Sequence, residues 1–205
     1  MSKTINNTEL CELFKKYSSD KCPEILHSYS PTYYELLSEY KYDFKNVLEI
    51  GVGNVPLMKP IVGEKYQVGS SLKSWRDFFP NSQIFGLDIK TDVLFEEDRI
   101  KCFYTDQSNG DQLEKTIKHI KDYKNNNELL FDMILDDGSH IIEHMILTFN
   151  TLKKHLKING FYIIEDIKLK DLHLFENLES DDMVIIKTHK GIGEWDSFIT
   201  YKKIK

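Results

Sequence analysis

The chain has 205 residues, of which 40% are hydrophobic and 29% are charged. At about 150 residues per domain, this length predicts one domain over residues 1–205, with an apolar core large enough to fold without a disulfide or a structural metal. The net charge of −6 would repel a phosphate backbone, so we expect no nucleic acid as a partner.

Membrane, targeting and redox signals are weak in this sequence. No run approaches ~18 apolar residues, which disfavours a transmembrane helix, and the N-terminal residues contain no apolar stretch typical of a signal peptide. The cysteines at positions 11, 22 and 102 are too widely spaced for a zinc motif or a disulfide framework. We therefore expect a cytoplasmic protein with no membrane partner.

The N-terminal third is predicted to be helical. Apolar residues recur at helical spacing over 10–17, and Thr8 stands where an N-cap is expected. A second helix is expected to begin near Pro31, because proline is well tolerated in the first turn. We interpret residues 1–45 as a helical cap and residues 46–205 as the core of the same domain.

From residue 46 onward, apolar runs alternate with amphipathic stretches, which predicts a parallel α/β sheet covered by helices. The predicted strands span 47–50, 83–88, 100–104, 130–135 and 161–164. The predicted helices span 71–79, 112–123 and 141–156. Residues 54–68 are predicted to form a loop, and the runs at 183–188 and 197–201 an antiparallel hairpin that closes the sheet.

A glycine or an acidic residue follows each of the five predicted parallel strands. In order, the strands are followed by Gly51, Asp88, Asp106, Asp136 and the pair Glu165–Asp166. In open α/β sheets, ligands bind outside the carboxyl ends of the strands. The sequence therefore predicts a ligand site at this edge of the sheet.

Three of these positions suit a nucleoside. Gly51 and Gly53 would let the backbone approach a ligand closely, Asp88 is placed to bond a ribose hydroxyl, and Asp106–Gln107 suits the edge of an adenine ring. The glycine motif alone is weak evidence, since a dinucleotide site needs a third glycine that opens a helix. A tight turn and acids that cap helices are the structural alternatives.

Residues 136–140, with the sequence Asp-Asp-Gly-Ser-His, form the most informative segment. They follow a buried strand, and the neighbouring strand ends on Glu165 and Asp166. Carboxylates at adjacent strand ends converge, and oxygen ligands suit a hard cation such as Mg²⁺. His140 beside them would be a general base near neutral pH for a substrate hydroxyl. The alternative is that the segment only caps the following helix.

Together these segments resemble the class I S-adenosylmethionine-dependent methyltransferases. More narrowly, the chain is similar, from about residue 21 to 167, to the metal-dependent sugar O-methyltransferases that modify deoxysugars on macrolides and polyketides, such as the mycinamicin and tetracenomycin sugar enzymes. The segments that carry the likeness are 27–29, 47–53, 71–80, 86–88, 106–108, 136–140 and 160–166.

The resemblance implies a Rossmann-like sheet of seven strands, with N-terminal helices and a C-terminal antiparallel hairpin, that binds S-adenosylmethionine and Mg²⁺. It implies that Asp137, Glu165 and Asp166 hold the metal ion. It further implies that His140 is the catalytic base, with Asp137 beside it at the reaction centre. The implied cofactor contacts are Glu49, Gly51, Ser71, Asp88, Asp106, Gln107 and Asp136.

We therefore hypothesise an Mg²⁺-assisted O-methyltransferase that acts on a sugar hydroxyl of a glycan or a glycosylated small molecule. A catechol-type acceptor is a close variant, because adjacent hydroxyls bind a metal alike. Two other hypotheses stay open: a nucleotide-binding oxidoreductase on a similar sheet, and a methyltransferase-like module that binds a cofactor or a partner without catalysis. Relatives of this kind suggest a homo-oligomer, which the sequence alone leaves open.

Overall fold

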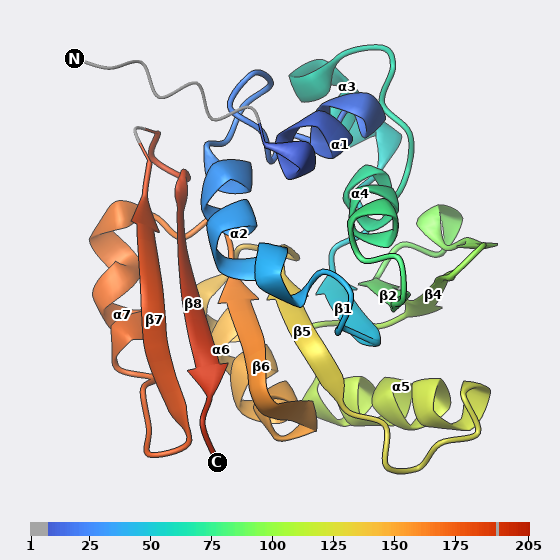
Figure 1. Cartoon of the computed structure of the whole chain (residues 1–205), viewed down its shortest axis with the longest axis vertical. Coiled ribbons are helices and arrows are strands. Elements are labelled where there is room, and N and C mark those ends of the chain that lie inside the picture. The colour runs from blue at the N-terminus through green and yellow to red at the C-terminus, as the bar shows by residue number, and fades with distance from the viewer. Residues whose placement is uncertain (1–7, 192) are drawn as a thin grey trace.

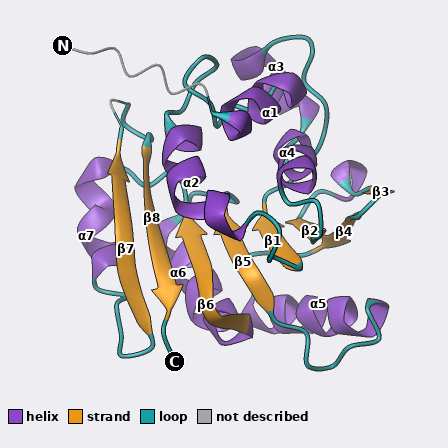
Figure 2. Cartoon of the chain, viewed as in Figure 1, coloured by secondary structure: helices purple, strands orange, loops and turns teal. Residues whose placement is uncertain are grey.

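The computed structural model describes residues 8–191 and 193–205, and a single sheet forms its centre (Figures 1 and 2). The strands are β1 (Asn46–Ile50), β2 (Gln83–Asp88), β3 (Glu96–Glu97), β4 (Ile100–Tyr104), β5 (Phe131–Asp136), β6 (Leu156–Ile164), β7 (Met183–Lys190) and β8 (Ser197–Lys203). Their order is β3-β4-β2-β1-β5-β6-β8-β7. Strands β4, β2, β1, β5 and β6 are parallel, whereas β3 pairs antiparallel with β4, and β8 antiparallel with β6 and β7.

Helices cover both faces of this sheet (Figure 1). They are α1 (Glu9–Tyr17), α2 (Tyr29–Leu37), α3 (Val55–Val62), α4 (Ser70–Phe78), α5 (Gly110–Tyr123), α6 (Ile142–Leu152) and α7 (Leu172–Glu176). Helices α1, α2 and α4 share one apolar cluster with Val47 of β1, whereas α5, α6 and α7 share the other with Leu48. Successive strand residues thus point to opposite faces, which buries both sides of the central strands.

The α/β class, the N-terminal helices and the C-terminal antiparallel hairpin predicted from the sequence are confirmed. The sheet has eight strands rather than seven, because the two-residue β3 adds an edge strand too short to show a periodicity. Within the described residues, no helix combines the length and the apolar character that crossing a bilayer requires. The signal-peptide prediction depends on residues 1–7, which lie outside the described chain.

Two predicted elements are wrong. Residues 54–68 are not all loop, since α3 begins after Asn54, whose side chain accepts a hydrogen bond from the Leu57 N–H. Its sequence is an almost continuous apolar run that contains Pro56 and Pro60, so it lacks the apolar period from which a helix is predicted. The predicted helix 141–156 ends at Leu152, and β6 begins at Leu156, where polar residues at its start hide the strand pattern.

The N-terminal helices are fixed to the core where α1 packs on α4. Phe14 meets Trp75 edge to face, with ring centroids 5.0 Å apart. Beside this contact, the Asp77 carboxylate accepts hydrogen bonds from the Tyr17 hydroxyl at 2.6 Å and from the Lys16 ammonium at 3.0 Å. Burial alone would raise the pKa of Asp77, but these donors, together with Arg76, lower it to about 2.

We expect Asp77→Asn to lower the free energy of unfolding by about 1–2 kcal/mol at neutral pH, because the hydrogen bonds to a charged acceptor are weakened. The pKa of Asp77 is below its ordinary value in the folded state, so its stabilisation is complete above that ordinary value and disappears as the pH falls toward ~2. Urea unfolding of both proteins across this range measures the difference. A difference that stays constant down to pH ~2 would contradict the assignment.

Candidate active site

A cavity of about 1030 Å³ opens at the carboxyl ends of the parallel strands. Its walls come from the loops that follow β1, β2, β4 and β5, from the segment before α2, and from the turn between β7 and β8. This volume suffices for a nucleoside-sized ligand and a second molecule beside it. The predicted site residues that line it are Gly51, Ser71, Asp88, Asp106, Gln107, Asp137, His140 and Asp166.

Two predicted cofactor contacts, Glu49 and Asp136, lie behind the cavity wall, and both are fully buried. Glu49 Oε1 accepts a hydrogen bond from the Ser71 hydroxyl at 2.6 Å, and the Asp136 carboxylate accepts from Gln107 Nε2 at 2.6 and 2.8 Å. Burial raises the pKa of each of the two carboxyl groups to about 7. They therefore reach the cavity through Ser71 and Gln107, which line it.

Gly51 allows the loop after β5 to pack directly against the loop after β1. Its φ is +94°, and a β carbon at this position would overlap the carbonyl oxygen of Asp137. The Asp137 N–H donates to the Ile50 carbonyl at 2.9 Å, which fixes the approach. The glycine is thus required by close contact as well as by its backbone conformation.

Asp88 and Asp106 organise the loops in which they stand. Asp88 accepts backbone hydrogen bonds from Val52 at 2.9 Å and from Lys90 at 2.8 Å. Asp106 accepts from the Ser108 N–H and hydroxyl, and these bonds lower the pKa of Asp106. Both carboxylates therefore bond groups of loops rather than capping a helix, since the N-cap of α5 is Asn109, and both also line the cavity.

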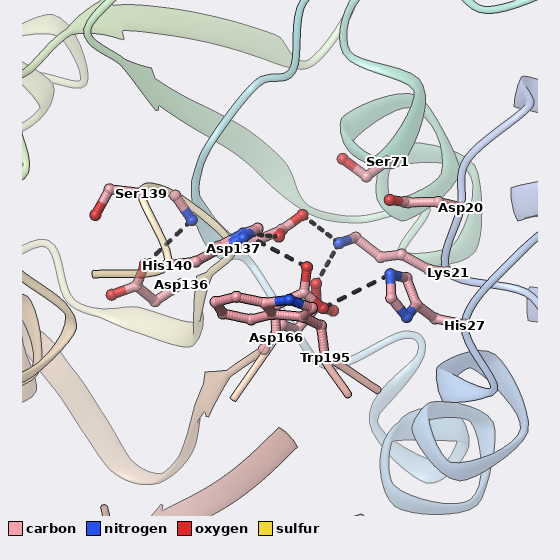
Figure 3. A network of polar contacts seen from close by, with 12 residues as sticks. Asp20, Lys21, His27, Ser71, Asp136, Asp137, Ser139, His140, Asp166 and Trp195 are labelled. Atoms are coloured by element: carbon pink, nitrogen blue, oxygen red, sulfur yellow. Dashed lines mark hydrogen bonds and ion pairs between the residues drawn. The ribbon is translucent and has the colours of Figure 1, made fainter. Parts of the chain in front are cut away.

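Asp137, His140 and Asp166 meet where β5 and β6 end (Figure 3). His140 Nε2 lies 3.2 Å from Asp137 Oδ1 and 3.5 Å from Asp166 Oδ2. One ligand atom from each of the three residues lies within 4.8 Å of the others. This spacing lets the three groups surround a single cation.

Glu165, the third predicted metal ligand, faces the N-terminal segment instead. Its two oxygens are hydrogen-bonded to the Lys21 ammonium and to the Tyr33 hydroxyl. The same ammonium lies 2.5 Å from Asp137 Oδ2. Sequence reasoning missed Lys21, because it stands in an irregular segment where no local pattern marks a buried charge.

The segment before α2 and the turn between β7 and β8 complete the site. The Tyr29 hydroxyl donates to Asp166 Oδ1 at 2.6 Å and lies 2.9 Å from the carbonyl oxygen of Trp195. His27 Nδ1 lies 3.3 Å from Asp196 Oδ1. His27 and Tyr29 belong to a segment that carries the family resemblance, whereas only the fold brings Trp195 and Asp196 here.

The predicted base, His140, and the predicted metal ligand Asp166 have an unfavourable backbone conformation. His140 and Asp166 have φ values of 55° and 52°, in the left-handed region that costs a non-glycine residue about 1–3 kcal/mol. Such strain persists where surrounding contacts hold it, commonly at functional sites. Burial alone would lower the pKa of His140, but the hydrogen bond and the charge of Asp137 raise it to about 9.

Known proteins with similar sequences are methyltransferases, although no family model matches the chain. The chain is 35% identical over 159 residues to the mycinamicin VI 2''-O-methyltransferase of Micromonospora griseorubida, a match that covers 78% of this chain and 36% of that protein. Demethylmacrocin O-methyltransferase of Streptomyces fradiae matches with the same identity and coverage. The chain thus spans just over a third of these relatives.

Solved structures agree with the sequence comparison. MycE methyltransferase from the mycinamycin biosynthetic pathway, in complex with Mg, SAH and mycinamycin VI, aligns with a TM-score of 0.73 and 28% identity. The alignment covers 97% of this chain and 55% of that one. A ribosomal RNA methyltransferase from Plasmodium falciparum, at 16% identity and a TM-score of 0.53, shares the fold alone.

The strand order, the antiparallel hairpin and the cavity at the strand ends define the fold of a class I S-adenosylmethionine-dependent methyltransferase. Within that class, the chain is similar to the sugar O-methyltransferases of macrolide and polyketide pathways. The comparisons therefore confirm the resemblance that the sequence motifs indicate.

The packing of the two loops can be tested with a pair of glycine substitutions. Gly51→Ala and Gly63→Ala both place a β carbon at positive φ, but only at Gly51 would that carbon overlap neighbouring atoms. We expect each change to cost about 1–3 kcal/mol for the backbone, and Gly51→Ala at least ~2 kcal/mol more. Urea unfolding measures both losses, and equal losses would contradict the role assigned to Gly51.

Proposed function

We propose that this chain is an S-adenosylmethionine-dependent, Mg²⁺-assisted O-methyltransferase that acts on a sugar hydroxyl of a glycan or a glycosylated small molecule. The observation that carries the proposal is the cluster of Asp137, His140 and Asp166 inside the cavity of this fold. Relatives named for methylating glycosylated macrolides, and the MycE complex with Mg, SAH and mycinamycin VI, support it. This likeness to methyltransferases favours the proposal over the oxidoreductase hypothesis.

The donor set fits a divalent cation. Asp137 and Asp166 offer carboxylate oxygens, and Glu165 supplies a third carboxylate next to them. When ionised, these three groups exceed the positive charge of Lys21 by two, so one Mg²⁺ would neutralise the cluster when His140 is in its neutral form. We assign Asp137, Glu165 and Asp166 as the residues that would hold the ion, in keeping with the preference of Mg²⁺ for oxygen ligands.

The cofactor would occupy the part of the cavity beside β1, β2 and β4. We assign the methionine moiety to Gly51 and Ser71, the ribose to Asp88, and the adenine to the loop of Asp106 and Gln107. Glu49 and Asp136 would not contact the cofactor directly. They would orient Ser71 and Gln107, which donate hydrogen bonds to them.

The chemistry of the proposal is direct methyl transfer to oxygen. When bound, the two groups supply an activated methyl and a Lewis acid that lowers the pKa of an acceptor hydroxyl. His140 is placed to take the hydroxyl proton, with its ring oriented by Asp137. Because the neighbouring carboxylates hold the pKa of His140 near 9, it can act as a base only where their charge is compensated.

We also propose that residues 1–45 and 46–205 act as one domain. The supporting observation is that Lys21 and Tyr29 of the N-terminal segment contact Asp137, Glu165 and Asp166. These contacts close one side of the cavity, which would exclude water from the reacting groups. A cytoplasmic location and a homo-oligomer stay predictions.

Calorimetry with S-adenosylhomocysteine, with and without Mg²⁺, tests the two binding assignments. We expect the nucleoside to bind the wild type, and an Mg²⁺ signal that is lost in Asp137→Asn, because a carboxylate ligand is removed. Asp111→Asn, an exposed change on α5, is the control and should bind like the wild type. No nucleoside binding would overturn the methyltransferase proposal, whereas nucleoside binding without an Mg²⁺ signal would overturn only the metal site.

Release of S-adenosylhomocysteine, with mycinamicin VI as the first acceptor probe, tests the base. We expect His140→Gln to lower kcat by about 10²–10⁴-fold, the usual contribution of a general base, with little change in nucleoside affinity. His173→Gln, an exposed change on α7 away from the cavity lining, is the control and should lose far less. Equal kcat values for wild type and His140→Gln would show that another group takes the proton.

A further inference from the structure

We propose that Lys21 is a positioning residue that competes with the divalent cation for Asp137 and Glu165, and thereby sets the affinity of the metal site. The inference rests on the proposed metal site and adds to it a residue that does not contact the reacting atoms. It is carried by the place of the Lys21 ammonium between two of the three assigned ligands.

The Lys21 ammonium is enclosed by the protein. The residue is 2% exposed, and Glu165, with which it pairs, is fully buried. The second oxygen of Glu165 accepts a hydrogen bond from Tyr33, which is also buried. Both oxygens of Glu165 are therefore engaged, and Glu165 can join a metal shell only if one of these two donors gives way.

The remaining oxygens of the cluster are divided between partners in the same manner. Asp137 directs Oδ2 toward Lys21 and Oδ1 toward His140. Asp166 directs Oδ1 toward Tyr29 and Oδ2 toward His140. A cation bound to Asp137 Oδ1 and Asp166 Oδ2 would thus share the Asp137 carboxylate with the ammonium, and two positive charges on one carboxylate repel each other.

Backbone hydrogen bonds fix the main chain from which the Lys21 side chain extends. The Ser30 N–H donates to the Lys21 carbonyl at 2.9 Å, and the His27 N–H donates to the Asp20 carbonyl at 2.8 Å. These bonds join the two ends of the segment between α1 and α2 and so hold it as a compact loop. The ammonium therefore lies between Asp137 and Glu165, and a cation that uses these carboxylates must bind against its charge or displace it.

A purely structural role for Lys21 makes a different prediction. A buried ion pair that only stabilises the fold would, when removed, lower the melting temperature and leave cation affinity unchanged. Competition predicts that the same removal lowers the stability of the metal-free protein and also tightens Mg²⁺ binding. Cation affinity in the folded variant therefore separates the two roles.

The test is Mg²⁺ titration calorimetry of the full chain, saturated with S-adenosylhomocysteine. Lys21→Met keeps the length of the side chain and removes its charge. We expect its Kd for Mg²⁺ to fall by about tenfold or more relative to the wild type. The matched control is Lys157→Met, which breaks the 2.7 Å ion pair with Asp132 at the start of β5 and should leave the Kd unchanged.

A double substitution identifies the ligand that Lys21 withholds. If the gain arises because Glu165 becomes available, Lys21→Met with Glu165→Gln should return the Kd to about the wild-type value. Near-ultraviolet circular dichroism establishes that each variant is folded. Should Lys21→Met fail to fold, Lys21→Gln, which keeps a donor without the charge, takes its place with the same expected tightening.

The outcomes separate this inference from the proposed function. An unchanged or weaker Mg²⁺ affinity in a folded Lys21 variant, with a wild type that binds Mg²⁺, overturns the competition and leaves the metal site intact. Absence of Mg²⁺ binding in both wild type and variant overturns both proposals. Mg²⁺ binding by the Lys21 variant but not by the wild type supports the competition, and would mean that Lys21 prevents the cation from binding.

Discussion

Three carboxylates meet where β5 and β6 end, and much of the surrounding structure serves to accommodate their charge. Glu165 is fully buried and Asp166 is 8% exposed, and carboxylates so enclosed are tolerated only when they are paired or hydrogen-bonded. The compensating donors are Lys21, Tyr29 and Tyr33, and Lys21 is 116 positions from Asp137 in the sequence. The N-terminal segment is therefore part of the site as well as a cover for the sheet.

Strand register brings these carboxylates together. β1 and β5 are parallel, with Ile50 opposite Asp136, so the next residues, Gly51 and Asp137, meet in the adjoining loops. β5 and β6 are also parallel, with Asp136 opposite Ile164, which sets Asp137 beside Glu165. A one-residue shift of either pairing would turn these side chains to the other face of the sheet. The site geometry is thus a consequence of sheet packing.

The parts of the site that could be predicted from sequence are those attached to regular strands. An apolar run followed by an acid fixes both a strand and its end, so the amino-acid pattern alone places Asp88, Asp137 and Asp166 at one edge of the sheet. Lys21 and Trp195 could not be placed in this way, because an irregular segment and a hairpin turn carry no period from which their positions follow. Helix α3 was not predicted for a related reason, since its almost continuous apolar run with two prolines shows no helical period.

His140 and Asp166 have backbone conformations that would suit a glycine better. A glycine would adopt φ values of 55° and 52° without strain, yet these positions carry an imidazole and a carboxylate. Neighbouring contacts hold both loops, since the Ser139 N–H donates to Gln107 Oε1 at 2.9 Å and Tyr29 donates to Asp166. Local preference and global fold disagree here, and such disagreements are expected where a side chain is kept for its chemistry. Of the six described non-glycine residues with positive φ, these two lie in one cluster, on loops that follow two different strands.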